Sequence, residues 1–186
     1  MQNAVRCTLA VALLALAACA TGPEPEPVRD AGLGNFRLGF NVVVVRDALQ
    51  GPGSQPIDEA ALQTAIAEAV VDRLGAYDGD GLYHLGIRVD AYVLAEPGTQ
   101  SESVLLMAAN VWDEASKRNL TAEPLEIAGI APAGTTNITE LAERAALALE
   151  DALRANASVW FAPKPDQPRV AFDRTAQQPS APATVN

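Results

Sequence analysis

Residues 78–81 place two carboxylates, Asp78 and Asp80, in alternation with glycines, which is a spacing that could hold a calcium ion. A calcium-binding loop that begins this way also needs an oxygen ligand at its fifth position and a bidentate glutamate at its twelfth. Those positions hold Leu82 and Val89. The segment therefore predicts a turn between a helix and a strand, and no metal site.

His84 is the only histidine of the chain, so acid–base or metal chemistry at this residue would need partners from elsewhere. No serine lies in the pattern of a nucleophile elbow. His84 falls on the polar side of an alternating segment, where we expect a solvated side chain. We also expect solvation for two acidic pairs, Asp113-Glu114 in a loop and Glu150-Asp151 on a helix flank. The sequence thus predicts no enzyme: it offers no catalytic residue, no metal site and no cofactor site.

Cys19 has the most specific chemistry in the chain. It follows Leu16-Ala17-Ala18 at the end of an apolar run that starts after Arg6. This layout is typical of a signal peptide, and the run is too short to span the ~30 Å core of a bilayer. A cysteine directly after the small residues resembles the lipobox of bacterial lipoproteins.

That resemblance implies attachment of diacylglycerol to the thiol, cleavage before Cys19, and acylation of the new amine by a fatty acid such as palmitate. Acyl chains that each bury many methylene groups, at ~0.8 kcal/mol per group, make such an anchor hard to reverse. The alternatives are an unmodified cysteine in an ordinary signal peptide, or a short membrane helix.

Composition restricts the classes of partner. The chain has 13 basic and 23 acidic residues, a formal net charge of −10. An acidic protein gains nothing from counterion release, so nucleic acid is excluded as a partner. The two cysteines are Cys7, which leaves with the signal peptide, and Cys19, so we expect no disulfide in the mature protein. No other segment predicts a transmembrane helix.

The chain divides into four segments. Residues 1–18 form the predicted lipoprotein signal peptide, and residues 19–35 form the lipidated cysteine and an extended tether rich in proline and glutamate. Residues 36–161 form the folded domain. Residues 162–186, with many prolines and few aliphatic side chains, are predicted to be a disordered tail.

Hydrophobic periodicity predicts the elements of the domain. A β-branched run at Val42–Val45 indicates a central strand, Asp58 is a candidate helix cap, and Pro124 indicates an edge or bulged strand. The predicted fold is α+β, a two-layer sandwich with two helices on one face of a mostly antiparallel four-stranded sheet, in the order β-α-β-β-β-α. The predicted elements are strand 36–46, helix 59–74, strand 82–94, strand 103–112, hairpin loop 113–119, strand 120–130 and helix 138–154.

One predicted strand, 103–112, is apolar on both faces, although the sheet face away from the helices should be polar. An exposed apolar patch of this kind can mark a site for a protein partner or a lipid. The alternative is that the tether, the tail or a loop covers it. The candidate interaction surface consists of Tyr92, Leu94, Val104, Leu106 and Trp112.

The lipobox, the proline-rich tether and the β-α-β-β-β-α domain together resemble small envelope-accessory lipoproteins of Gram-negative bacteria. These include the lipopolysaccharide-assembly, lipid-transport auxiliary and curli-secretion or TolB-like lipoproteins. The stretch Val111-Trp112-Asp113, with the polar turn before Leu120, is similar to a long hairpin common in that group. The resemblance is architectural and transfers no functional residue.

The resemblance implies a non-enzymatic protein anchored by lipid to the outer membrane and facing the periplasm, with the inner membrane as the alternative location. The residue after the lipidated cysteine, Ala20, is similar to the outer-membrane sorting pattern. We expect the protein to support an envelope assembly or transport complex through protein–protein contact. The alternative is a periplasmic binding module for a lipid or another apolar ligand.

Overall fold

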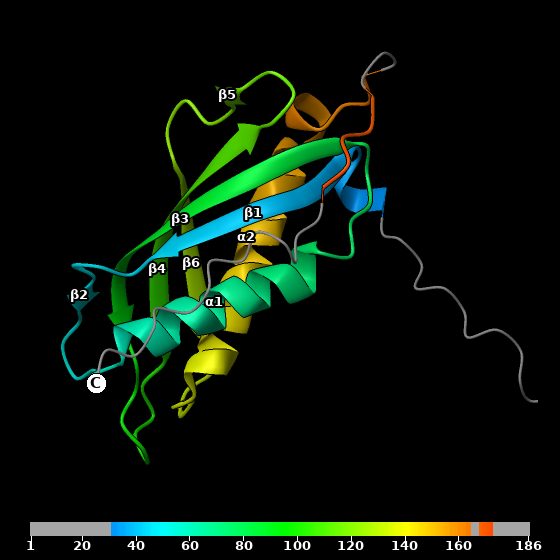
Figure 1. Ribbon diagram of the computed structural model, residues 1–186. Helices are drawn as coiled ribbons and strands as arrows, with labels where there is room; N and C mark the ends of the chain where they lie inside the picture. The colour runs from blue at the N-terminus through cyan, green and yellow to red at the C-terminus, as the bar shows by residue number, and fades with distance from the viewer. Residues whose placement is uncertain (1–30, 165–167, 173–186) are drawn as a thin grey trace, which may run out of the picture.

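Two helices pack on the same face of a β-sheet in the computed structural model, which describes residues 31–164 and 168–172 (Figure 1). The α+β class is as predicted, but the sheet has six strands in place of four, because two strands of two residues each extend it at its margins. The elements are η1 Ala31–Leu33, β1 Phe36–Val44, β2 Leu49–Gln50, α1 Glu59–Leu74, β3 Gly81–Val93, β4 Ser103–Asp113, β5 Arg118–Asn119, β6 Leu125–Ala131 and α2 Ile138–Trp160.

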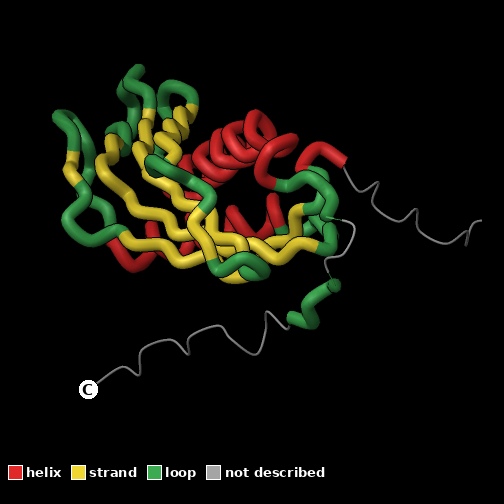
Figure 2. The backbone as a smooth tube through the Cα atoms, turned by 90° about the horizontal axis from the view of Figure 1, so that it is seen from above, coloured by secondary structure: helices red, strands yellow, loops and turns green. Residues whose placement is uncertain are grey.

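The long strands lie side by side in one layer (Figure 2). Their order is β1, β3, β4, β6. Strands β1 and β3 are parallel, because α1 connects them as a crossover, while β3, β4 and β6 are antiparallel neighbours. Among the described strands β6 pairs only with β4, so it is an edge strand, one of the two predicted alternatives. It begins at Leu125, later than the predicted start at residue 120.

The prediction that β1 is a central strand is wrong, because β1 pairs only with β3 among the described strands. The apolar run pointed to burial on both faces, but only its inward side chains are buried. Val42 and Val44, which point away from the helices, remain 59% and 45% exposed. The outer face of the sheet therefore begins with exposed valines at its β1 margin.

Local capping sets where both helices begin. The Asp58 carboxylate accepts hydrogen bonds from the backbone N–H groups of Ala60 and Ala61, and α1 has the predicted bounds. The Asn137 side chain caps α2 in the same way through the N–H of Thr139. Helix α2 continues to Trp160, beyond the predicted end at 154, because nothing in the alanine-rich segment 152–157 breaks a helix.

The core lies between the sheet and the helices and ends in an aromatic cluster. The rings of Phe36 and Tyr83 stack at 5.6 Å, and Phe161 meets both edge-on, at 5.0 and 4.8 Å. Leu33 is fully buried beside this cluster, and the N–H of Asn35 donates to the Phe161 carbonyl at 2.8 Å. Packing thus reaches into the segment predicted to be tether, and the domain starts before Phe36.

Part of the predicted tail also contacts the domain. Lys164 forms an ion pair with Asp113, and the ring of Phe172 lies against Phe40. Proline-rich composition indicated a tail without contacts, but a few charged and aromatic side chains suffice to dock the described residues 162–164 and 168–172. The other tail residues, like residues 1–30, lie outside the described part of the chain.

A register shift in β3 changes which side chains face the helices. The pairing with β4 slips between Val89 and Ala91, which is the signature of a β-bulge. Before the shift the odd-numbered residues point inward, and after it Tyr92 and Leu94 point inward, 8% and 5% exposed. The prediction that Tyr92 and Leu94 lie on the outer face is therefore wrong, because it assumed an unbroken period of two.

Candidate interaction surface

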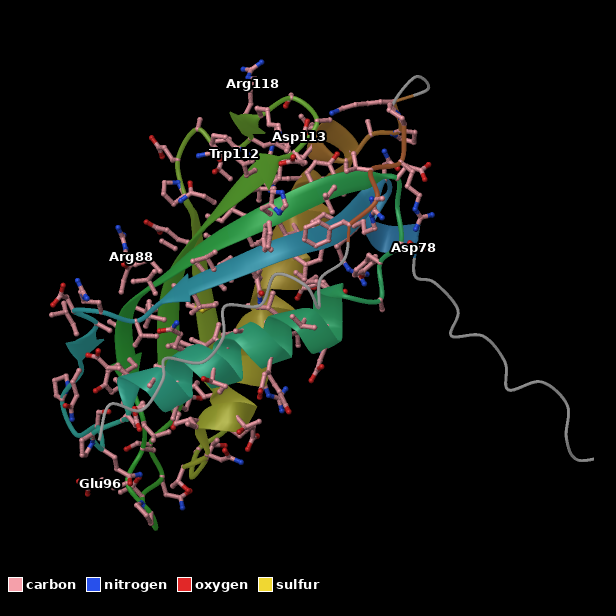
Figure 3. All side chains as sticks on the ribbon, in the orientation of Figure 1. Asp78, Arg88, Glu96, Trp112, Asp113 and Arg118 are labelled. Atoms are coloured by element: carbon pink, nitrogen blue, oxygen red, sulfur yellow. The ribbon has the colours of Figure 1, made fainter. Side chains whose placement is uncertain are left out.

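Strand β4 presents its even-numbered side chains on the sheet face away from the helices. Leu105 and Met107 are buried in the core, whereas Leu106 and Trp112 are each 43% exposed and Val104 is half-buried. Trp112 projects near the end of the strand (Figure 3). Three of the five predicted surface residues thus lie on the outer face.

Neighbouring strands extend the apolar surface around Leu106. Leu106 pairs with Ala91 of β3 and Ala128 of β6. Two residues before Leu106 on β4, Val104 pairs with Val93 of β3 and with Ile130 of β6. Ile130 is 52% exposed. We define the β4 patch as these outward residues of three adjacent strands: Ala91, Val93, Val104, Leu106, Ala128 and Ile130.

Trp112 lies apart from the β4 patch. It comes six positions after Leu106, which corresponds to about 20 Å along a strand. Its cross-strand neighbours are His84 on β3 and Asn119 on β5, so its surroundings are more polar. The structure therefore brings Val104 and Leu106 together and places Trp112 at the other end of the face.

A shallow hollow separates the two ends. Its volume is about 200 Å³, and its lining includes Val42, Gly86, Arg88 and Asn110. A side chain at Gly86 would meet nothing within 4 Å, so the glycine leaves this space open. The hollow is smaller than the 300–1,000 Å³ of typical ligand sites.

Two larger hollows, of about 480 and 410 Å³, lie between α1 and α2. Charged side chains dominate their linings, among them Glu68, Asp72, Arg73 and Glu143. An apolar ligand would have to desolvate these charges, which is unfavourable.

His84 is held by hydrogen bonds instead of being solvated, so the expectation for it was wrong. Its Nδ1 accepts from the backbone N–H of Phe40 at 2.9 Å, and its Nε2 lies 3.1 Å from a Glu114 carboxylate oxygen. The acceptor role of Nδ1 places the proton of the neutral ring on Nε2, which donates to Glu114. The hydrogen bond from Lys117 is the main reason that the pKa of Glu114 lies below its ordinary value.

Glu150 is buried, contrary to the expectation of a solvated helix flank. Its carboxylate binds Arg73 at 2.6 Å and Arg154 at 2.9 Å, and it accepts a hydrogen bond from the Tyr77 hydroxyl. Burial alone would raise the pKa of Glu150, but these hydrogen bonds outweigh it and lower the pKa. Burial, together with the bond to Glu150, raises the pKa of Tyr77 to about 12. This network joins α1 to α2.

Asp113 is also buried, 1% exposed, and its partners are Lys164, Ser116 and the N–H of Ala115. Burial opposes its ionisation, but the hydrogen bonds, led by that from Lys164, lower its pKa. Burial, with the nearby charge of Asp113, raises the pKa of Tyr83 to about 12. Like the Glu150 network, this cluster is fully hydrogen-bonded, which indicates a structural role.

The part of the chain that the structure describes contains no group of histidine, cysteine, aspartate or glutamate arranged to hold a metal ion. Over the same residues, neither helix is long and apolar enough to cross a membrane. Sequence patterns missed the two buried ion networks because their partners come from distant elements.

No family model matches the chain, and no curated protein matches it. Among solved structures, a DUF330 protein of Xanthomonas campestris is similar with a TM-score of 0.37 and 14% identity, over 72% of this chain and 86% of that one. PelC of Paraburkholderia phytofirmans, a dodecamer, is similar with a TM-score of 0.40 and 9% identity, over 63% of this chain and 87% of that one. A Caulobacter crescentus protein described as a lipoprotein has a TM-score of 0.39 and 14% identity, over 64% of this chain and 91% of that one. These values assign the chain to no family.

Proposed function

We propose that this protein is a lipid-anchored envelope lipoprotein that supports an assembly or transport complex by binding a partner protein through its β4 patch. The observation that carries the proposal is the exposure of Leu106 and Ile130 on adjacent strands. The solvated face of such a sheet is normally polar, and clustered apolar side chains there are typical of interaction sites.

The three hollows described above favour a protein partner over an apolar ligand. The space over Gly86 is small and open, and the hollows between the helices are lined by charges. A flat patch spread over three strands fits a protein surface better than it fits a lipid chain. The binding-module alternative therefore has less support.

Cys19 supplies the anchor in this proposal. Fourteen peptide steps separate it from Leu33, the first fully buried residue in the part of the chain that the structure describes. A chain of that length reaches at most about 50 Å when fully extended. We propose the periplasmic side of the outer membrane as the location, so the partner must reach a domain whose Leu33 lies at most that far from the anchor.

The test replaces Leu106 with glutamate in the full-length protein and follows which envelope proteins co-purify after crosslinking in native membranes. A charge on the patch should abolish the partner's co-purification while the melting temperature stays within a few degrees. The control is Gln63→Glu, at an exposed position of α1, which should leave co-purification unchanged.

Two results would contradict the proposal. One is a Leu106→Glu protein that keeps all its partners. The other is a strongly destabilised Leu106→Glu protein, which would mean that the patch is covered within the chain and that the new charge is buried.

A further inference from the structure

The described C-terminal segment, residues 168–172, lies against one end of the outer sheet face, away from the β4 patch. Its basic residue, Arg169, forms an ion pair with Asp78, and a second guanidinium nitrogen lies 3.9 Å from Asp80. Asp78 lies at the end of the sheet where this segment passes (Figure 3). The Arg169 guanidinium thus lies near two carboxylates, those of Asp78 and Asp80.

The rest of the segment makes a main-chain contact and an aromatic contact. The Arg37 guanidinium donates to the carbonyl of Val170 at 2.5 Å. The ring of Phe172 meets Phe40 edge-on with centroids 5.1 Å apart, and lies 6.0 Å from His84. A basic side chain, a backbone carbonyl and an aromatic ring are therefore each recognised by a different group.

The seat for the aromatic ring is rigid. Hydrogen bonds to both ring nitrogens hold the His84 imidazole, whose ring lies 5.0 Å from Phe40. A Cβ at Gly39, next to Phe40, would lie 2.4 Å from the imidazole Nδ1, so a residue larger than glycine there would displace the ring. A site that is held in place before its ligand arrives loses little entropy on binding.

We propose that these residues form a peptide-binding site for an extended segment with a basic residue three positions before an aromatic one. In the free protein the occupant is the chain's own Arg169–Phe172 segment, and the intermolecular ligand is a partner protein segment with the same pattern. The site shares no residue with the β4 patch, so it does not depend on the function proposed above.

The contacts explain how an exchange of occupants can work. The ion pair is partly exposed, with Arg169 49% and Asp78 30% exposed, so water weakens it. Such weak contacts persist because the segment belongs to the same chain, which gives an effective concentration on the order of millimolar. A partner held nearby on the same membrane can reach a similar local concentration and compete.

The experiment uses the single histidine as a reporter. The full-length protein in detergent is labelled with ¹³C-histidine, so that its ring signals report His84 alone. At fixed pH, the double variant Arg169→Ala/Phe172→Ala should shift these signals, because the ring current of Phe172 is lost. A synthetic amidated peptide of residues 168–172 (Pro-Arg-Val-Ala-Phe) should then restore them in a saturable way, with a Kd of about a millimolar or tighter.

Two matched controls accompany the titration. The same peptide with both Arg and Phe replaced by Ala should leave the signals unchanged. Phe172→Leu, which keeps an apolar side chain but has no ring current, should shift the His84 signals without unfolding the protein.

Identical His84 signals in the parent protein and both variants would overturn the proposal, because the segment would not be seated. Signals that shift in the variant but do not respond to saturating peptide would also overturn it, since the contact would then be intrachain packing only. Leu106→Glu should leave the peptide titration unchanged, so failure of this site and failure of the β4 patch are distinguishable.

Discussion

Replacing Glu150 with alanine should cost about 2–4 kcal/mol of unfolding free energy. The carboxylate is 5% exposed and is the common partner of Arg73, Arg154 and the Tyr77 hydroxyl. Losing one partner of a fully buried ion network costs ~3–5 kcal/mol. The two arginine side chains are 38% and 37% exposed and regain water, which lowers that figure. The tyrosine hydroxyl is buried and loses its acceptor.

The assay is urea unfolding at pH 7, followed by tryptophan fluorescence and far-UV circular dichroism. With a slope of ~2 kcal/mol per molar urea, the middle of the usual range, the Glu150→Ala midpoint should fall by roughly 1–2 M. Glu150→Gln keeps an acceptor for the Tyr77 hydroxyl, so its urea midpoint should fall by about half as much. Glu143→Ala, an exposed position on the same helix, is the control. The reasoning is refuted if Glu150→Ala and Glu143→Ala have the same midpoint.

Three further predictions concern pH, packing and anchoring. Stability should fall as pH drops below about 4, because Glu150 and Asp113 have lowered pKa values and stabilise the fold only while ionised. Stability should also fall as pH rises from about 10 towards 12, because Tyr77 and Tyr83 have raised pKa values and stabilise the fold only while protonated. Thermal melts at low and at high pH check both limits. Gly129→Val should cost about 1–3 kcal/mol because even a Cβ there would lie 2.6 Å from helix α2, whereas the outward Ala128→Val should be nearly neutral, as chemical denaturation will show. Cys19→Ser should release the protein into the soluble periplasmic fraction or leave it unprocessed, and a variant that matures yet stays with membranes would contradict the anchor.

Local signals in the sequence predict much of the fold. The Asp58 cap and the apolar spacing over 59–74 predicted α1 with the bounds that the structure shows, because capping and amphipathic periodicity act within a few residues. Pro124 indicated an edge or a bulged strand, and the strand that begins directly after it, β6, is an edge strand. The position of β1 at a margin was missed, since an apolar run such as Val42–Val45 does not distinguish a covered face from one that remains open.

The candidate surface was predictable only in part, because strand faces depend on an unbroken register. Alternation correctly placed Val104 and Leu106 outward on β4. The bulge in β3 left no mark in the sequence and moved Tyr92 and Leu94 into the core. A single extra residue moves every following side chain of the strand to the opposite face of the sheet, so this error follows from the period of two.

Contacts between distant residues were beyond the reach of sequence patterns. Tyr77 and Glu150 are 73 positions apart, and Arg169 and Asp78 are 91 apart. Only the folded chain brings each pair together. The acidic residues therefore gave no sign of burial, and the proline-rich composition of the tail concealed the docking of Phe172.

The central claim is that the β4 patch binds a partner in the envelope. The most direct measurement is photocrosslinking in living cells, with p-benzoylphenylalanine at position 106 of the full-length, membrane-anchored protein. Position 63, on the exposed side of α1, serves as the control. We expect position 106 to give a discrete crosslinked species that contains an envelope protein, and position 63 to give none. The claim is contradicted if position 106 gives no crosslinked species, or only the products seen from position 63.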